Sequence, residues 1–217
     1  MTDANQIPPL TRLRPLRMGD AAPGFQARTT LGEVRLSDYR GKWLVLFSHP
    51  ADFTPVCTSE FVALAKASEA FGALDCELLG VSVDSLYSHL AWVRAIREKF
   101  AITIPFPIIE DPSMAIGRAY GMIDPEATDS SAIRATYFID PSGLIRAMTW
   151  YPQNVGRSVA EMLRMVAALK RTTADEVLTP EGWCPGDDLL LPPLQNQESV
   201  VGVDDEHWFY RIQKESK

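Results

Sequence analysis

Cys57 is the residue best placed to do chemistry, because of the residues directly before it. The sequence reads Thr54-Pro-Val-Cys57. Thr54 is a favourable N-cap and Pro55 suits the first helical position, so Cys57 is predicted in the first turn of a helix. A thiol there faces free backbone N–H groups and the positive end of the helix dipole, which favour the reactive thiolate. Position alone leaves a buried, unreactive cysteine as the alternative.

The remaining cysteines and the histidines form no cluster in sequence. The chain has three cysteines: Cys57, Cys76 and Cys184. This odd, sparse set without a CxxC pair predicts free thiols in a reducing compartment. The three histidines also stand far apart: His49, His89 and His207. No zinc-like ligand spacing exists, so no metal site is predicted.

The elements around Cys57 are predicted from apolar patterning. Trp43–Phe47 is a continuous apolar run, typical of a strand buried on both faces. The helix bearing Cys57 follows this strand, which is where open α/β sheets place their sites. Leu78–Val83 predicts a second buried strand, and a second helix follows it. One face of that helix is predicted from four residues: Leu86, Leu90, Val93 and Arg97.

The second half of the domain adds short elements and a hairpin. Phe106–Ile109 predicts a third strand, and Asp140-Pro-Ser-Gly143 is a turn signal between strands at Ala135–Ile139 and Leu144–Thr149. Ser158 begins a capping-box sequence that opens a last helix. Strand–helix alternation followed by a hairpin and a helix predicts an α/β fold with a central mixed sheet and helices on both faces.

Residues 175–217 differ in character from the chain before them. They contain four prolines and show little periodicity. We expect a domain over residues 1–174 and an extended C-terminal arm over residues 175–217, with a strand-like patch at His207–Ile212. An arm of this kind must pack on its own domain or on a partner subunit, and the partner of a homodimer is the expected choice.

The composition excludes several classes of function. The formal net charge is -7 and no basic face is apparent, which argues against a nucleic-acid partner. No apolar stretch reaches the ~20 residues that span a bilayer, and the N-terminus lacks the apolar core of a secretory signal. The expected protein is soluble and cytoplasmic, without a membrane partner.

A longer motif around Cys57 resembles the active-site motif of the peroxiredoxin family. Pro50, Thr54 and Cys57 fall in the pattern P-x-x-x-T-x-x-C, here PADFTPVC, followed by Thr58-Ser-Glu60. Further family-like blocks follow along the chain: Ser82–Ser85, His89–Trp92, Phe106–Ile109, Arg134–Asp140 and Gly156–Ser158. The arm, with Thr179-Pro180, Trp183 and Leu191-Pro-Pro193, resembles the 1-Cys or six-type subgroup.

This resemblance implies a thioredoxin-like fold and a thiol-dependent peroxidase that reduces hydrogen peroxide and organic hydroperoxides. Cys57 would be the peroxidatic nucleophile, which attacks the peroxide and becomes a sulfenic acid. The Thr54 hydroxyl and the Cys57 N–H would hold the peroxide oxygens. Arg134 would stabilise the thiolate and donate to the peroxide, and Pro50 would shield the thiolate from water. No cofactor is implied.

Three further residues match supporting positions of the family. Glu60 would orient Arg134 or a second arginine, Arg157. On the residues alone, Arg157 could simply pair with Glu161 on the helix surface. His49 is interpreted as a packing or hydrogen-bonding residue rather than a proton carrier.

Two cysteines and the partners complete the set of expectations. Cys184, in the setting Trp183-Cys-Pro185, is the candidate resolving cysteine or is incidental, and Cys76 is expected to be buried and inert. The resemblance implies a hydroperoxide substrate, an external thiol reductant and a homodimer, with a decameric ring as a further assembly.

Two alternatives to a peroxidase are weighed. A thioredoxin-like disulfide reductase would need a second thiol at position 60, where Glu60 stands. A peroxide sensor or redox-controlled holdase would use the same cysteine, and turnover with a thiol reductant separates it from a peroxidase.

Overall fold

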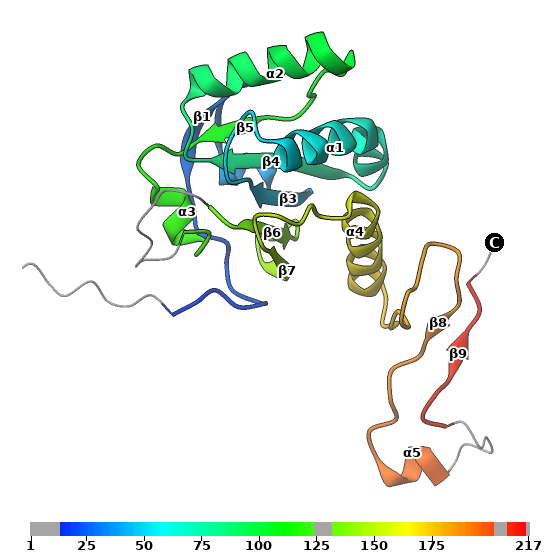
Figure 1. The fold of residues 1–217 in the computed structure, drawn as a ribbon. Coiled ribbons are helices and arrows are strands. Elements are labelled where there is room, and N and C mark those ends of the chain that lie inside the picture. The colour runs from blue at the N-terminus through cyan, green and yellow to red at the C-terminus, as the bar shows by residue number, and fades with distance from the viewer. Residues whose placement is uncertain (1–13, 124–131, 202–207, 216–217) are drawn as a thin grey trace, which may run out of the picture.

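The described part of a computed structural model, residues 14–123, 132–201 and 208–215, contains a mixed sheet of seven strands (Figure 1). Its spatial order is β2-β1-β5-β4-β3-β6-β7. The strands are β1 (Gln26–Thr29), β2 (Gly32–Arg35), β3 (Trp43–Ser48), β4 (Cys76–Ser82), β5 (Ile108–Glu110), β6 (Arg134–Ile139) and β7 (Ile145–Tyr151). β3, β4 and β5 run parallel, and β1 and β6 pair antiparallel with β5 and β3. The predicted mixed sheet is confirmed.

Helices cover both faces of this sheet, as predicted. The described part of the domain contains five helices: η1, a 3-10 helix (Leu36–Tyr39), α1 (Pro55–Ala73), α2 (Leu86–Phe100), α3 (Ala115–Ala119) and α4 (Val159–Ala174). Apolar residues of α1, α2 and α4 form one cluster with one face of the sheet, and residues of η1 and α3 join the cluster on the other. The hydroxyl of Ser158 accepts the Glu161 N–H at the start of α4, while the Glu161 carboxylate pairs with Arg164.

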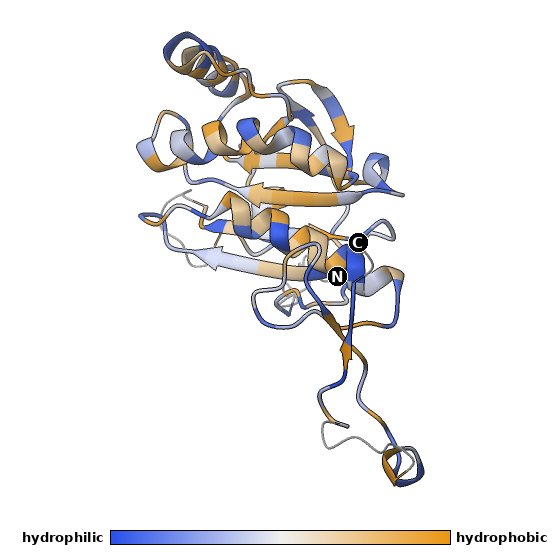
Figure 2. Ribbon diagram, turned by 90° about the vertical axis from the view of Figure 1, so that its right-hand side faces the viewer, coloured by the Kyte–Doolittle hydropathy of each residue, from blue (hydrophilic) through white to orange (hydrophobic). Residues whose placement is uncertain are grey.

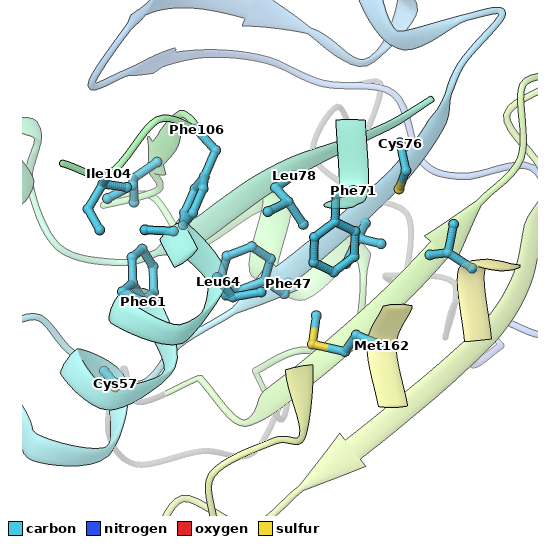
Figure 3. Close-up of a cluster of buried hydrophobic side chains, with 14 of the residues drawn as sticks. Phe47, Cys57, Phe61, Leu64, Phe71, Cys76, Leu78, Ile104, Phe106 and Met162 are labelled. Atoms are coloured by element: carbon cyan, nitrogen blue, oxygen red, sulfur yellow. The ribbon is translucent and has the colours of Figure 1, made fainter. Parts of the chain in front are cut away.

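The central strand β3 explains where the core lies. All six of its residues are buried, because helices cover both faces and strands flank both edges. Val45 and Phe47 point into the cluster under α1, and Leu44 and Leu46 into the opposite cluster. Cys57 lies at one end of the cluster under α1 (Figure 3). Figure 2 shows the hydrophobic colouring of the central strands between more hydrophilic segments.

The predicted face of α2 was partly wrong. Leu90 is 41% exposed, whereas His89, Trp92 and Ile96 are buried against the sheet. Apolar spacing predicted Leu90 on the buried face because histidine is a polar residue and was left out of the pattern. His89 can be buried because Asp52 and the Ile109 carbonyl oxygen satisfy its ring nitrogens. The helix begins after Ser85, whose hydroxyl accepts the Ser88 N–H.

The C-terminal arm packs on α4 where it starts and then extends away from the domain (Figure 1). Val177, Trp183 and Leu189 pack with Ala167 and Ala168 of α4. The arm contains β8 (Leu189–Leu190), α5 (Gln197–Val201) and β9 (Ile212–Gln213), and β8 pairs antiparallel with β9. Of the predicted strand at positions 207–212, only the last residue lies in β9, and His207 lies outside the described residues.

Candidate active site

Cys57 lies in the first turn of α1, as the sequence predicts, and its side chain is fully buried. Thr54 is the N-cap residue by its backbone, but its hydroxyl makes no cap bond. Instead, Thr54 Oγ1 donates to the carbonyl oxygen of Ala51 at 2.8 Å. The hydroxyl therefore closes the loop between β3 and α1, which is a correction to its predicted role as a side-chain cap.

Arg134 reaches Cys57 from the first residue of β6. Its Nη1 donates to Cys57 Sγ at 3.3 Å and to Glu60 Oε2 at 2.9 Å. Its Nε and Nη2 both donate to the carbonyl oxygen of Gln153, at 2.9 and 2.7 Å. Because every guanidinium nitrogen has an acceptor, the group is fixed in one orientation beside the thiol. The guanidinium is aimed at the sulfur.

Glu60 binds two arginines at once. Oε1 accepts from the Arg157 backbone N–H and Nε at 2.7 and 3.0 Å, and Oε2 accepts from Arg157 Nη2 at 2.8 Å as well as from Arg134. Burial alone would raise the pKa of Glu60, but the bonds and charges of Arg157 and Arg134 hold it below its usual value. The three side chains are at most 3% exposed. The alternative pairing of Arg157 with Glu161 is wrong, since Glu161 binds Arg164.

His49 and Pro50 follow the last residue of β3. His49 is completely buried, and its Nε2 lies 2.9 Å from Asp52 Oδ1, so it is a hydrogen-bonding residue as interpreted from the sequence. Burial lowers the pKa of His49, against the opposing effect of Asp52. Pro50 is half-buried at the start of the loop that leads to Cys57.

Sequence reasoning missed two residues of this region, Asp52 and His89. His89 Nδ1 lies 2.8 Å from Asp52 Oδ2, which brings together two histidines that are 40 positions apart in sequence. Asp52 stands inside the motif PADFTPVC, two residues before Thr54, and this position was the available signal. His89 opens the family-like block His89–Trp92, but nothing in the sequence placed that block beside Asp52, because it lies on α2.

The other two cysteines differ strongly from Cys57. Burial raises the pKa of Cys76 to about 12, in keeping with a buried and inert thiol. Cys184 is exposed on the arm, where its backbone N–H donates to Asp187. All three cysteines are free, so the structure does not join Cys184 to Cys57.

An apolar hollow of about 730 Å³ lies between α1 and α2, next to the loop that carries Thr54. Its lining includes Thr54, Pro55, Trp92 and Phe100, with Lys99 among its few charged groups. No helix in the described ranges is long and apolar enough to cross a membrane.

Comparisons with known proteins point to one family. Residues 18–148 match the model of the AhpC/TSA family. A peroxiredoxin of Methanosarcina mazei is 43% identical over 215 residues, which cover 92% of this chain and 98% of the relative. A yeast mitochondrial 1-Cys peroxiredoxin, studied for thiol resolution via glutathione/thioredoxin systems, has a TM-score of 0.83 and 39% identity, covering 92% of this chain and all of that one. A cysteine-to-serine mutant of peroxiredoxin 6 from Arenicola marina has a TM-score of 0.77 and 31% identity, covering 85% and 87%.

The fold is a thioredoxin-like α/β fold, with a buried cysteine at the start of a helix and an arginine aimed at its sulfur. These features define the class of protein. The chain belongs to the AhpC/TSA family, the peroxiredoxins. The protein is a thiol-dependent peroxidase that reduces hydroperoxides through a cysteine sulfenic acid. The comparisons do not favour the alternative of a peroxide sensor or redox-controlled holdase.

Proposed function

We propose that Cys57 is the peroxidatic cysteine of this peroxidase. The observation that carries the proposal is Arg134 Nη1, which lies 3.3 Å from Cys57 Sγ at the first turn of α1. The thiolate sulfur attacks the terminal peroxide oxygen, an S–O bond forms, and the O–O bond breaks. The other oxygen leaves as hydroxide or alkoxide and takes up a proton, which gives water or an alcohol and a sulfenic acid.

We assign Arg134, Thr54 and Pro50 to the peroxide-binding part of the site. The positive charge of Arg134 supports stabilisation of both the thiolate and the oxygen on which charge develops. The Thr54 hydroxyl donates to Ala51 in the resting loop, and in the complex it would turn to a peroxide oxygen together with the Cys57 N–H. Pro50, half-buried beside the loop, would limit the access of water. Glu60, Arg157 and His49 support these groups.

The second half of the cycle is proposed to use an external thiol. A thiolate attacks the sulfenic sulfur, hydroxide leaves with a proton as water, and a second thiol reduces the mixed disulfide. Cys184 is exposed on the arm and unpaired, which supports a 1-Cys cycle over one resolved within the subunit. Three free cysteines support a reducing, cytoplasmic compartment.

The substrates are proposed to include organic hydroperoxides as well as hydrogen peroxide. The apolar hollow between α1 and α2 borders Thr54 and has a volume typical of sites that hold small organic molecules. It offers space for the hydrocarbon part of an organic hydroperoxide beside the loop that carries the site.

We further propose a homodimer in which residues 1–174 are the peroxidase domain and residues 175–217 a small dimerisation domain. The support is the arm's exposed apolar surface. Five large side chains there are 39–78% exposed: Val201, Trp208, Phe209, Tyr210 and Ile212. Several large exposed apolar side chains on one segment are typical of an interface between proteins.

The deciding experiment measures steady-state peroxide consumption with dithiothreitol for three proteins: wild type, Cys57→Ser and Cys184→Ser. We expect Cys57→Ser to lose all turnover, because it removes the nucleophile, and Cys184→Ser to keep full turnover. Turnover by Cys57→Ser would overturn the assignment of the nucleophile. Loss of turnover in Cys184→Ser alone would instead show that this thiol resolves the sulfenic acid.

A further inference from the structure

Behind the active-site loop lies a buried hydrogen-bonded group that the proposed chemistry does not use. Asp52 Oδ1 lies 2.9 Å from His49 Nε2, and Asp52 Oδ2 lies 2.8 Å from His89 Nδ1. His89 Nε2 lies 3.1 Å from the carbonyl oxygen of Ile109. The side chains of both histidines are 0% exposed and that of Asp52 is 2% exposed.

Metal binding does not explain this group. The three residues could offer a metal ion one ligand atom each, all within 4.8 Å of one another. However, each carboxylate oxygen lies at hydrogen-bond distance from one imidazole nitrogen, which leaves those lone pairs engaged. The number of protons on the two imidazole rings therefore determines the charge of this group.

The acceptors around His89 determine that count. A carbonyl oxygen only accepts, so His89 Nε2 must carry a proton to bond with Ile109. Burial alone would raise the pKa of Asp52, but the hydrogen bonds from His49 and His89 hold it well below its usual range. An ionised carboxylate also only accepts, so His89 Nδ1 must carry a proton as well. An imidazole ring with protons on both nitrogens is a cation.

His49 completes the group as a neutral ring. Its Nε2 donates to Asp52, and its buried Nδ1 has no hydrogen-bond partner among the described residues. A proton on that nitrogen would be buried without an acceptor, which is costly. The ring therefore holds the tautomer with its proton on Nε2.

Two acidic groups and one imidazole ring lie on the elements around the pair. Asp84, after β4, accepts the Asp52 N–H at 2.9 Å. Glu110, at the end of β5, accepts the Leu86 N–H at the start of α2 and also pairs with Arg28. The His49 ring, from the end of β3, lies 5.9 Å from the His89 ring.

We propose that His89 is a buried cation that positions the active-site loop through Asp52. Asp52 lies midway between Pro50 and Thr54, so an ion pair with α2 holds the loop that must place both residues around Cys57. The bond from His89 to β5 fixes the ring itself. His89 and Asp52 are thus positioning residues, and their effect on catalysis rests on the proposed role of Cys57.

Nitrogen NMR of ¹⁵N-histidine protein tests the charge directly and does not depend on activity. The chain has three histidines, and His49→Gln and His89→Gln assign their signals. At neutral pH we expect both His89 nitrogens to show the protonated shift, and His49 to show an unprotonated Nδ1. One unprotonated nitrogen on His89 would mean a neutral ring beside a protonated Asp52, and the proposal would be wrong.

Single-turnover kinetics test the positioning role. We expect His89→Gln to slow oxidation of Cys57 by peroxide on the order of tenfold or more. Alkylation of Cys57 by iodoacetamide should stay unchanged, because it does not need the aligned loop. Tyr87→Gln, on an exposed residue of the same helix, is the matched control and should behave as wild type.

A double-variant cycle separates this role from general damage to the fold. Asp52→Asn combined with His89→Gln should slow peroxide oxidation no more than either change alone, because each one already breaks the pair. Additive losses, or equal losses in oxidation and alkylation, would contradict the proposal. These outcomes would not affect the proposed role of Cys57 as the nucleophile. That role is tested separately, by the loss of all turnover in Cys57→Ser.

Discussion

Around Cys57, one carboxylate faces two guanidinium groups. Glu60 neutralises one of the charges of Arg134 and Arg157, and all three groups are buried. The remaining positive charge is costly in a buried site unless an anion accompanies it. The thiolate of Cys57 and then the departing oxygen are the anions that the proposed reaction supplies. In the proposed reaction, the same charge imbalance favours the transition state, in which negative charge develops on the departing oxygen.

Arg134→Ala tests this imbalance. We expect the rate constant for oxidation of Cys57 to fall on the order of a hundredfold, because a charged donor aimed at the developing oxyanion is lost. The fold should be affected far less, since Glu60 keeps its three bonds from Arg157. Stopped-flow oxidation and thermal unfolding measure the two effects. Normal peroxide kinetics in this variant would contradict the role given to Arg134.

Glu60→Gln tests the charge on the shared carboxylate. The pKa of Glu60 is lowered in the folded protein, so its ionised form stabilises the fold above the unfolded pKa. That contribution is lost as pH falls through the folded pKa. We expect wild type to be more stable than Glu60→Gln at pH 7, with the difference shrinking below about pH 4. Urea unfolding at several pH values measures it, and a difference independent of pH would contradict the prediction.

At the scale of elements, two connections place the chemistry. The loop from β3 to α1 sets Cys57 at the start of a helix, and β6 carries Arg134 to it because β6 pairs with β3. A third connection joins the arm to the domain through α4. Trp183 is 3% exposed there, and its indole N–H donates to the Asp187 carbonyl oxygen.

Trp183→Ala should release the start of the arm from α4. Truncating a buried tryptophan costs roughly 3 kcal/mol or more, and here the loss falls on a small satellite cluster rather than the main core. We expect faster proteolysis within residues 175–193, with the melting of the domain little changed. Trp208→Ala, at a residue that is 39% exposed, is the control. Equal rates of proteolysis in Trp183→Ala and Trp208→Ala would show that Trp183 does not hold the arm on α4.

At the scale of the whole molecule, the described part of the arm beyond residue 193 extends away from the domain, and Glu215 near its end pairs with Arg171 of α4 (Figure 1). Large apolar side chains are exposed along it. A surface of this kind is stable in water when another protein covers it, and a second copy is the partner we propose.

Truncation after Pro193 tests this interface. The shortened chain keeps Val177, Trp183 and Leu189 on α4, so the domain should fold normally. We expect the dissociation constant of the dimer to rise on the order of tenfold or more, which sedimentation velocity measures. Circular dichroism controls for folding. A truncated chain that dimerises as tightly as the full chain would place the interface elsewhere.

The sequence alone was sufficient for features that depend on neighbouring residues. The position of Cys57 follows from Thr54-Pro55, and the buried strand β3 follows from its apolar run, because helix starts and strand burial leave local signals. The motif, through its resemblance, also named Arg134 and Glu60. Arg134 could not have been chosen from its own surroundings, since a lone arginine before a strand is ordinarily exposed.

The tertiary structure decided which side chains meet. Glu60 lies 74 and 97 positions from the two arginines that it binds. Asp52 lies 37 positions from His89. Because His89 is buried, the buried face of α2 differs from the face that apolar spacing predicted. Such partners are set by the order and register of β3, β4, β5 and β6. Long-range pairing of this kind leaves no periodic signal in the sequence, because each contact is made by a single residue.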